Sequence, residues 1–416
     1  MSAYVTEICK KAKAASFALG QLSGEEKNAA LCHMANALEV NAQKILAANQ
    51  LDVEVAKAKG MKAALLDRLA LDKKKIDNMA KELREVSALA DPVGSIERTW
   101  TRPNGLIIGI LRVPMGVVGV IYESRPNVTS DAAGISIKSG NAVILRGGSD
   151  AINSNVAIGE VLRDALTGTG VPADAIQVVA SPDRAVAEEL MGMREYIDVL
   201  VPRGGADLIK TVVEKSKIPV IETGVGNCHV YVSEDADLNA AIPIIINAKC
   251  QRPGVCNAAE KLLVDAAIAK AFLPKAIAAL REKGVEIRGD AETKKIVPDV
   301  KLATEQEWYI EYLDLIMGVK VVKNVDEAVA HINKYSSHHS DSILTASFDK
   351  ALKFIKQVDS AAVYWNASTR FTDGNQFGLG AEIGISTQKL HARGPMSAQH
   401  LTTTKYFVLG RGHIRE

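Results

Sequence analysis

The stretch GVVGVIYESRPNVTSDAAGISIKSGNAVILR, residues 116–146, decides the fold class of this chain. Two short apolar runs, 116–122 and 142–146, flank a segment at 128–139 with helical spacing of its apolar residues, and Asn127 is the expected helix cap. A strand, a helix and a strand in this order indicate two parallel strands joined by a crossover helix. Both runs are apolar on both faces, which is typical of strands covered by helices on each side. The stretch therefore predicts a doubly wound parallel α/β sheet.

The alternation of strands and helices continues toward the C-terminus. Further strands are expected at 176–180, 197–201, 218–221, 229–233, 261–265, 319–322, 342–346 and 361–365, with helices between most of them. The number of strands is enough for two α/β domains, which agrees with a length of 416 residues at about 150 residues per domain. We expect the first domain to end near residue 228 and the second to cover 229–365.

The region before the first sheet has a different composition. Residues 1 to about 90 are rich in Ala, Lys, Glu and Leu at helical spacing. Ser23 followed by Glu26 fits a capping box at the start of a long helix. We interpret this region as a helical layer that covers the sheet.

A hairpin is expected between the helical region and the first sheet. Arg98–Arg102 and Leu106–Val113 flank an Asn-Gly pair, which is a strong hairpin signal between two extended runs. The tail Leu401–Leu409 is rich in β-branched and aromatic residues and is a candidate partner strand. Because the hairpin at 98–111 and the tail at 396–416 have no obvious place in either core, we predict that they form a subunit contact in a homo-oligomer.

The composition excludes several classes of protein. The 50 basic and 49 acidic residues nearly balance, which argues against a nucleic-acid partner, and 47% apolar residues argue against disorder. Five cysteines without a CxxC pair predict neither a disulfide framework nor a metal site. No uncharged apolar run of about 18 residues and no signal-peptide core is present, so we expect no membrane partner and a cytoplasmic location.

One cysteine differs from the others in its local context. Cys256 follows a Pro-Gly turn in CQRPGVCN, residues 250–257, which would present its thiol from a loop. Arg252 lies nearby in the sequence and would favour the thiolate form. Cys250 ends a helical pattern and is interpreted as structural, whereas Cys228 ends a Gly-rich turn and stays open.

Two loops that leave predicted strands carry further candidates, because ligands bind such sheets at the carboxyl ends of strands. Asn127 is either a helix cap or a hydrogen-bond donor to a developing oxyanion. Glu222, in VIETGVGN at 220–227, is either a solvated acid or a proton-transfer group. The segment GTGVPA at 168–173 matches the spacing of a dinucleotide-binding fingerprint, which has to follow a strand and begin a helix. Here the segment follows a helix and precedes a strand, so we interpret it as a helix end and a turn.

Eight blocks in the chain occur in an order that is specific to one group of enzymes. They are RVPMGVVGVIYESRPNVTSDAAG (112–134), LRGGSDAINSN (145–155), VPRGG (201–205), PVIETGVGNCHVYV (219–232), CQRPGVCNAAEKLLV (250–264), EYLDLI (311–316), HHSDSI (338–343) and GLGAEIGISTQKLHARGP (378–395). Together these blocks resemble the aldehyde dehydrogenase superfamily and, within it, the gamma-glutamyl phosphate reductase family. The resemblance implies an aldehyde dehydrogenase-like fold of two doubly wound α/β domains with a β-hairpin oligomerisation element.

The resemblance also implies roles for single residues. Cys256 falls at the catalytic nucleophile and Asn127 at the asparagine that stabilises the oxyanion. Glu222 falls at the general base of hydrolytic relatives. After Thr223 the chain has Gly-Val-Gly-Asn where those relatives have Leu-Gly-Gly, which argues against a hydrolytic role of Glu222. The implied cofactor is NADPH or NADP, with Glu311 at the nicotinamide ribose and Arg146 near the adenosine ribose.

The remaining implied positions concern substrate, cofactor and domains. Gly204 and Gly205 are expected in the cofactor site, and the candidate contacts of the substrate's amino and carboxylate groups are Arg125, Arg252, Ser386 and Gly380. The expected division is a cofactor-binding domain at 1–97 and 112–228, a catalytic domain at 229–365, an active-site loop region at 366–395, and the oligomerisation elements at 98–111 and 396–416.

The implied reaction is the NADPH-dependent reduction of L-glutamyl 5-phosphate to L-glutamate 5-semialdehyde and phosphate. It proceeds through a thioester on Cys256 and is the second step of proline synthesis from glutamate, with glutamate 5-kinase as a candidate partner. A hydrolytic or CoA-acylating aldehyde dehydrogenase on the same fold is the first alternative, because a fold does not determine a substrate. A cofactor-binding protein without catalysis is the second, and it predicts an unreactive Cys256.

Overall fold

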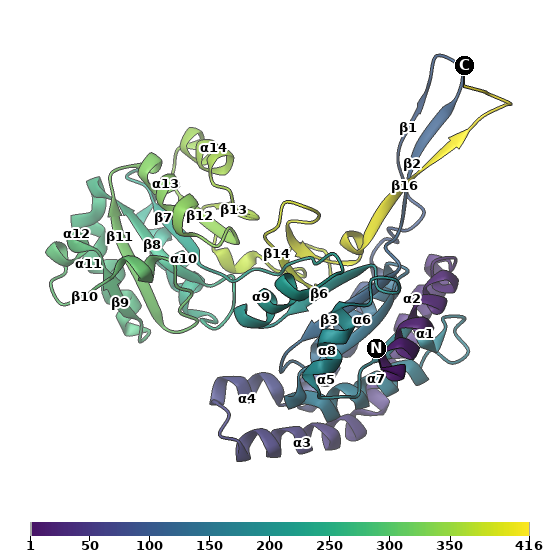
Figure 1. Cartoon of the computed structure of the whole chain (residues 1–416). Helices are drawn as coiled ribbons and strands as arrows, with labels where there is room; N and C mark the ends of the chain where they lie inside the picture. The colour runs from purple at the N-terminus through teal and green to yellow at the C-terminus, as the bar shows by residue number, and fades with distance from the viewer. Residues whose placement is uncertain (1, 416) are drawn as a thin grey trace. The chain divides into compact units, whose positions relative to one another are not determined.

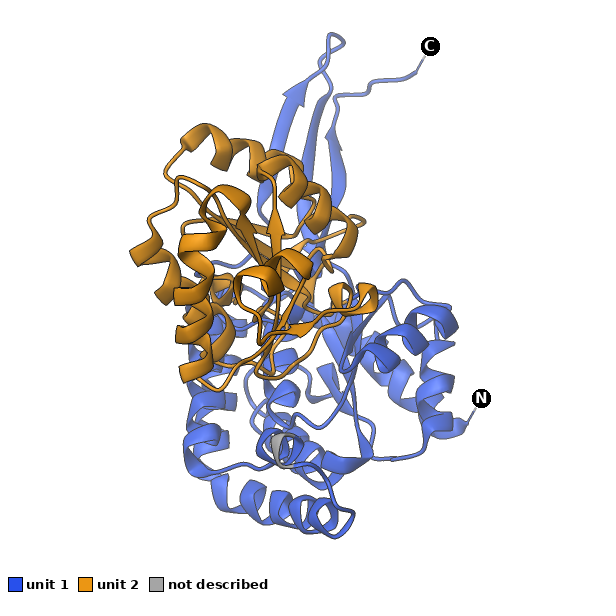
Figure 2. Ribbon diagram, turned by 90° about the vertical axis from the view of Figure 1, so that its left-hand side faces the viewer, with its two compact units in different colours: residues 1–222, 378–384, 396–416 blue, residues 223–377, 385–395 orange. Residues whose placement is uncertain are grey.

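The structure, a computed structural model, describes residues 2–415 and divides into two compact units, which Figure 2 shows in separate colours. Unit 1 runs to Glu222 and includes Gly378–Gly384 and the C-terminal segment from Met396, and unit 2 comprises Thr223–Phe377 and Ile385–Pro395. This division differs from the expected one in two places. Residues 223–228 belong to unit 2, and the loop region at 366–395 is shared between the units.

Unit 1 is built on a four-stranded parallel sheet with the strand order β5-β4-β3-β6. The strands are β3 (Val117–Tyr122), β4 (Ala142–Gly147), β5 (Ile176–Val178) and β6 (Val199–Arg203). Every residue of β3 and β4 is buried, as the apolar runs predict. The predicted strand at 218–221 is wrong: Val220 forms one isolated bridge with Leu200, because Pro219 offers no N–H to extend the pairing.

Two helical layers cover this sheet. The helices of unit 1 are α1 (Ala3–Leu19), α2 (Gly24–Val40), α3 (Ala42–Ala58), α4 (Ala63–Leu69), α5 (Lys73–Ala88), α6 (Asn127–Lys138), η1 (Ser149–Ala151), α7 (Ile152–Asp164), η2 (Ala173–Ala175), α8 (Arg184–Met191) and α9 (Ala206–Lys215). α6 and α7 pack on the strands, and α2, α3 and α5 pack on α6 and α7 as an outer layer, whereas α1 contacts β3, β4 and β5 directly. The predicted capping box is confirmed, with Glu26 accepting from the Ser23 N–H at 2.8 Å.

A separate three-stranded antiparallel sheet extends from unit 1 (Figure 1). Its strands are β1 (Ile96–Thr101), β2 (Ile107–Pro114) and β16 (Thr402–Leu409), in the order β1-β2-β16. The pairing of the C-terminal tail with the hairpin is thus confirmed, with Ile110 opposite Tyr406. Tyr406 is 68% exposed and Leu409 is 56% exposed, so the strand presents apolar side chains that no part of the described chain covers.

Unit 2 contains a seven-stranded parallel sheet with the order β10-β9-β11-β8-β7-β12-β13. Its strands are β7 (Cys228–Val232), β8 (Ala259–Asp265), β9 (Glu286–Gly289), β10 (Lys301–Leu302), β11 (Ile316–Val322), β12 (Ser340–Leu344) and β13 (Ala362–Trp365). Its helices are α10 (Leu238–Cys250), α11 (Ala266–Glu282), α12 (Ala291–Ile296), η3 (Glu305–Trp308), α13 (Val325–Tyr335), α14 (Phe348–Gln357) and η4 (Thr369–Phe371).

Alternate residues of β8 build the two cores of unit 2. Leu262 and Val264 lie in the core formed with α10 and α11, whereas Leu263 lies in the core formed with α13 and α14. Both faces of the sheet are therefore apolar, as a parallel sheet between two helical layers requires. The C-terminal region adds the short strands β14 (Gly384–Ser386) and β15 (Gly394–Met396) and the turn η5 (Ala398–Leu401).

Within the described residues, no helix is long and apolar enough to cross a membrane. The part of the chain from 2 to 415 also contains no cluster of three or more His, Cys, Asp or Glu side chains that could hold a metal ion.

Candidate active site

The carboxyl edge of the unit 1 sheet has a topological switch point between β3 and β6, where ligands bind doubly wound sheets. β3 leads into Glu123 and β6 leads into Gly204 and Gly205, and the Gly205 N–H donates to the Glu123 carboxylate at 2.8 Å. A Cβ atom at Gly204 would lie 2.6 Å from Glu123 Oε2 and 2.7 Å from Leu208 Cδ2, so a larger residue would force these side chains to shift. The two predicted glycines thus lie at the switch point, immediately before α9.

Arg146 lies at the same edge, near the carboxyl end of β4. Its side chain is 9% exposed, and Nη2 donates to the carbonyls of Pro182 and Asp183 at 3.1 Å each. Its buried Nε has no hydrogen-bond partner. Burial lowers the pKa of Arg146, and the nearby Arg184 lowers it further. Arg146 therefore holds the loop before α8 and keeps an unused donor in the interior of unit 1.

Asn127 is the first residue of α6, and Pro126 occupies the cap position, so the predicted capping role is wrong. The Asn127 side chain instead donates from Nδ2 to Asp131 Oδ2 at 2.8 Å. Burial of the Asp131 carboxyl group and the neighbouring Glu82 raise the pKa of Asp131 well above its usual range. This hydrogen bond fixes the orientation of the Asn127 amide and leaves its second N–H available.

Cys256 lies in the loop between α10 and β8, at the amino edge of the unit 2 sheet, and its side chain is partly exposed. Its carbonyl oxygen accepts a hydrogen bond from Cys228 Sγ at 3.1 Å. Cys228 is fully buried, and burial raises the pKa of its thiol well above the usual value. Cys228 therefore supports the Cys256 loop as a neutral thiol, which settles the role that its sequence context left open.

Gly226 packs against the backbone of Cys256. A Cβ atom at Gly226 would lie well under 3.0 Å from the O, C and Cα atoms of Cys256. The Gly226 N–H donates to Glu311 Oε1 at 2.7 Å, and burial raises the pKa of Glu311. The structure thus brings Cys256 and Glu311, both predicted, to the same short segment of unit 2.

Two buried charged residues at the start of β8 hold the Glu311 loop in place. Lys261 Nζ donates to the carbonyl of Ile310 at 2.7 Å and to Asn227 Oδ1 at 2.8 Å. Glu260 accepts from the Leu313 N–H at 3.2 Å. Burial lowers the pKa of Lys261 to about 7. Because the residues on either side of Glu311 are anchored, its carboxylate has little freedom to move.

A second cation lies beside the cysteine loop in addition to Arg252. η4 is attached to this loop, because Thr369 Oγ1 donates to the Asn257 carbonyl at 2.7 Å and Asn257 Nδ2 donates to the Thr372 carbonyl at 2.8 Å. Burial and the neighbouring Arg252 lower the pKa of Arg370, whereas the negative charge of a Cys256 thiolate raises it. A cation that interacts with this cysteine would favour its thiolate form.

The other predicted residues are distributed over both units. Glu222 and Arg125 are partly buried residues of unit 1, and Gly380 of unit 1 has a positive φ of 71°. Ser386 belongs to unit 2, where it is fully buried, pairs with Thr223 and accepts from the Gln388 N–H at 3.2 Å. Their predicted roles stay predictions.

Sequence reasoning missed several residues that support this site. Asp131 could have been found, since it lies four positions after Asn127 and therefore on the same face of the helix. Gly226 lies in a block that was recognised, but its close approach to Cys256 has no local signal. Lys261 and Arg370 are brought to the site by contacts between distant segments, and no spacing in the sequence indicates them.

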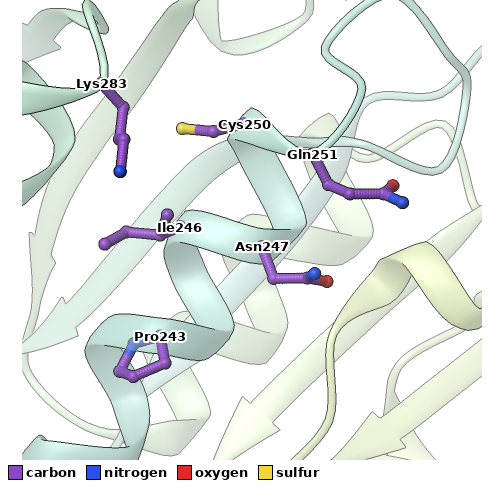
Figure 3. A pocket seen from close by; sticks show the side chains of 6 residues that line it. All are labelled: Pro243, Ile246, Asn247, Cys250, Gln251 and Lys283. Atoms are coloured by element: carbon purple, nitrogen blue, oxygen red, sulfur yellow. The ribbon is translucent and has the colours of Figure 1, made fainter.

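A pocket of about 530 Å³ lies on α10 next to the cysteine loop (Figure 3). It is lined by Pro243, Ile246, Asn247, Cys250, Gln251 and Lys283. Cys250 belongs to this pocket and to α10, in agreement with a structural role, and burial raises the pKa of its thiol. Gln251 connects the pocket to the site, because its Oε1 accepts from Arg370 Nε at 2.7 Å.

Comparisons with known proteins agree with this arrangement. The sequence profile described as "Aldehyde dehydrogenase family" matches residues 2–301. A gamma-glutamyl phosphate reductase of Thermoanaerobacter sp. (strain X514) is 60% identical over 407 residues, which cover 98% of each chain. The crystal structure of a gamma-glutamyl phosphate reductase from Thermotoga maritima has 53% identity and a TM-score of 0.97, covering 99% of this chain and 100% of that one.

A more distant solved structure extends the likeness in fold. An acetylating aldehyde dehydrogenase from Geobacillus thermoglucosidasius matches with a TM-score of 0.72 at 20% identity, covering 99% of this chain and 98% of that one. At this identity the match supports the predicted aldehyde dehydrogenase-like α/β fold and nothing about the substrate. The higher identities decide the family: this chain belongs to the gamma-glutamyl phosphate reductase family of the aldehyde dehydrogenases.

Proposed function

We propose that the chain reduces L-glutamyl 5-phosphate to L-glutamate 5-semialdehyde and phosphate, the second step of proline synthesis from glutamate. The observation that carries this proposal is the partly exposed Cys256, held by Gly226 and Cys228 in a chain 60% identical to a gamma-glutamyl phosphate reductase. A partly exposed cysteine that interacts with the charge of Arg370 also argues against a cofactor-binding protein without catalysis, because a nearby cation favours the thiolate form.

The chemistry begins at the sulfur of Cys256. The thiolate attacks the carbonyl carbon of the acyl phosphate, a C–S bond forms, and the C–O bond to phosphate breaks with its electron pair leaving on the phosphate oxygen. The oxyanion of the tetrahedral intermediate is stabilised by the Asn127 amide and by the Cys256 backbone N–H. Each such donor contributes roughly 10²–10³ in rate. After reduction, collapse of the thiohemiacetal releases the aldehyde and regenerates the thiolate.

Membership of the family implies a nicotinamide cofactor, and the residues of unit 1 fit one. Gly205 lies at the carboxyl edge of the sheet immediately before α9, and the buried Nε of Arg146 has no hydrogen-bond partner among the described residues. When bound, the cofactor supplies the hydride that reduces the thioester carbon. We assign Gly204 and Gly205 to the cofactor phosphates, Arg146 to the adenosine 2′-phosphate of NADPH, and the Glu311 carboxylate to the hydroxyls of the nicotinamide ribose.

The remaining roles follow from the same reaction. Glu222 is not required as a base for hydrolysis, since phosphate and not water exchanges with the thioester. The α-amino and α-carboxylate groups of the substrate are assigned to Arg125, Ser386 and the backbone at Gly380, because a carboxylate suits a guanidinium or N–H groups. Arg252, the other candidate for these groups, is an exposed residue of the loop that carries Cys256.

A coupled assay tests the proposal. The chain is mixed with glutamate 5-kinase, ATP, glutamate and NADPH, and NADPH consumption is followed. We expect consumption only when all four are present, because the kinase must supply the acyl phosphate. A hydrolytic enzyme would instead reduce NADP⁺ with the aldehyde and water in phosphate-free buffer. A CoA-acylating enzyme would do so only when CoA is added, and a protein without catalysis would show neither activity.

A further inference from the structure

Two arginines lie on the segments around Cys256, and Asp373 attracts Arg370 without forming a salt bridge with it. Arg252 belongs to the loop that carries Cys256, and Arg370 belongs to η4, which is attached to that loop through Thr369 and Asn257. Among residues 2–415, neither guanidinium forms an ion pair with a carboxylate. Two like charges are thus held close together, and a bound anion would relieve the repulsion between them.

The orientation of Arg370 is fixed in a way that keeps most of its donors available. Its Nε donates to Gln251 Oε1 at 2.7 Å, and Gln251 is the residue before Arg252. The two terminal nitrogens of Arg370 accordingly have no acceptor in the described structure. A guanidinium held through Nε presents its Nη donors in the planar geometry that matches a phosphate.

We propose that Arg252 and Arg370 together bind the phosphate group that Cys256 displaces. This proposal rests on the proposed function and names the chain's contacts with the leaving group. The reacting carbon of L-glutamyl 5-phosphate carries the phosphate through a single oxygen, whereas the α-carboxylate is four carbon–carbon bonds away. Cations beside the sulfur therefore reach the phosphate and not the α-carboxylate.

The two cations act on both partners of the displacement. As the thiolate attacks, negative charge moves from the sulfur to the oxygen that leaves with the phosphate, and the two guanidinium groups would attract the charge in both positions. In the reverse direction a phosphate oxygen attacks the thioester carbon, a C–O bond forms, and the electron pair of the C–S bond returns to the sulfur. No oxidation accompanies this exchange, so it can be measured separately from hydride transfer.

The test uses the reverse reaction of the full chain with L-glutamate 5-semialdehyde, NADP⁺ and increasing inorganic phosphate. Arg370→Gln and Arg252→Gln are expected to raise the KM for phosphate roughly 10- to 100-fold, the loss typical of a hydrogen bond to a charged group. The amplitude of the NADPH burst without phosphate should stay at one per active site, because acylation of Cys256 does not need phosphate. Lys270→Gln, which removes an exposed charge from α11, should change neither value.

A second measurement needs neither cofactor nor turnover. Inorganic phosphate bound between the two arginines would raise the thiol pKa of Cys256 and slow its alkylation by iodoacetamide in a saturable manner. We expect this protection in the unmodified chain and in Lys270→Gln, and its loss in Arg252→Gln and Arg370→Gln. Arg370→Lys keeps the charge without the planar donors and should recover only part of the phosphate affinity.

Two results would overturn different claims. An unchanged phosphate KM and unchanged protection in both arginine variants would refute this phosphate site and leave the reductase assignment intact. Sustained turnover of the unmodified chain without phosphate would refute the reductase assignment itself. Because Arg252 is exposed, its replacement is not expected to affect folding, so the test does not depend on the stability of the Arg370 variants.

Discussion

Replacing Gly226 with alanine perturbs the position of Cys256 without removing any catalytic group. The added Cβ would lie well under 3.0 Å from the O, C and Cα atoms of Cys256, and these are backbone atoms that cannot rotate away. One of the two segments has to move by more than about 1 Å, and a misplacement of this size costs roughly 100-fold in rate. Overpacking of this kind also costs about 1–3 kcal/mol of the free energy of unfolding.

The same movement disturbs two hydrogen bonds that define the site. The Gly226 N–H donates to Glu311 at 2.7 Å, and Cys228 Sγ donates to the Cys256 carbonyl at 3.1 Å. We therefore expect kcat/KM for NADPH consumption in the coupled assay to fall at least roughly 100-fold, with slower alkylation of Cys256.

A matched glycine variant separates this effect from a general loss of stability. Gly192→Ala adds a Cβ that meets only the Glu189 carbonyl at 3.3 Å, at the end of α8 in unit 1. It should retain near-normal kcat/KM, and its thermal unfolding should change little. The reasoning would be refuted if Gly226→Ala retained normal kcat/KM and alkylation rates, because the structure leaves no room for the added carbon.

Four further outcomes are expected. Deletion of residues 402–416 removes β16 and its apolar side chains, and sedimentation should then show a monomer or aggregate; an unchanged oligomer would contradict the predicted subunit contact. Arg146→Ala should raise the KM for NADPH more than the KM for NADH. Equal effects on both would indicate that Arg146 has only a structural role, through its hydrogen bonds to the carbonyls of Pro182 and Asp183. In phosphate-free buffer, NADPH formation from the semialdehyde should stop after one turnover. Cys256→Ser should abolish this burst of NADPH, whereas Cys250→Ser should retain it. Continued turnover that releases free glutamate would favour a hydrolytic enzyme. Burial lowers the pKa of His331 to about 2, against 6.5 for an exposed histidine. Below pH 6.5 this histidine therefore binds a proton in the unfolded chain but not in the folded one. The free energy of unfolding consequently decreases as the pH falls below 6.5. Denaturant unfolding should show a loss of about 2 kcal/mol at about pH 5, and this loss should be reduced in His331→Phe, whereas an identical pH profile in both proteins would contradict the assignment to His331.

The local pattern of the sequence was enough for most of the fold. Apolar runs such as 116–122 and 142–146 became buried parallel strands, because a strand between two helical layers needs apolar residues on both faces. The pairing of the tail with the hairpin followed from the strand-like composition of both. The strand predicted at 218–221 is wrong, because Pro219 has no N–H with which to extend the pairing beyond the one bridge between Val220 and Leu200.

The residues of the site likewise divide into those that the local sequence indicates and those that only tertiary contacts bring together. Cys256 was found from its Pro-Gly turn and its sequence block, both of which are local. The contacts around it were not found: Gly226 packs against its backbone, Cys228 donates to its carbonyl and η4 is attached to its loop. These contacts depend on how β7, β8 and η4 meet at one edge of a sheet.

The sequence by itself thus determined most of the strands and helices and indicated which cysteine to propose as the nucleophile, since these depend on residues a few positions apart. Only the tertiary structure decided which charged groups surround that cysteine. Lys261 and Arg370 come from segments far apart in the chain, and the order of parallel strands, which no local pattern specifies, brings them to the edge of the sheet where Cys256 lies.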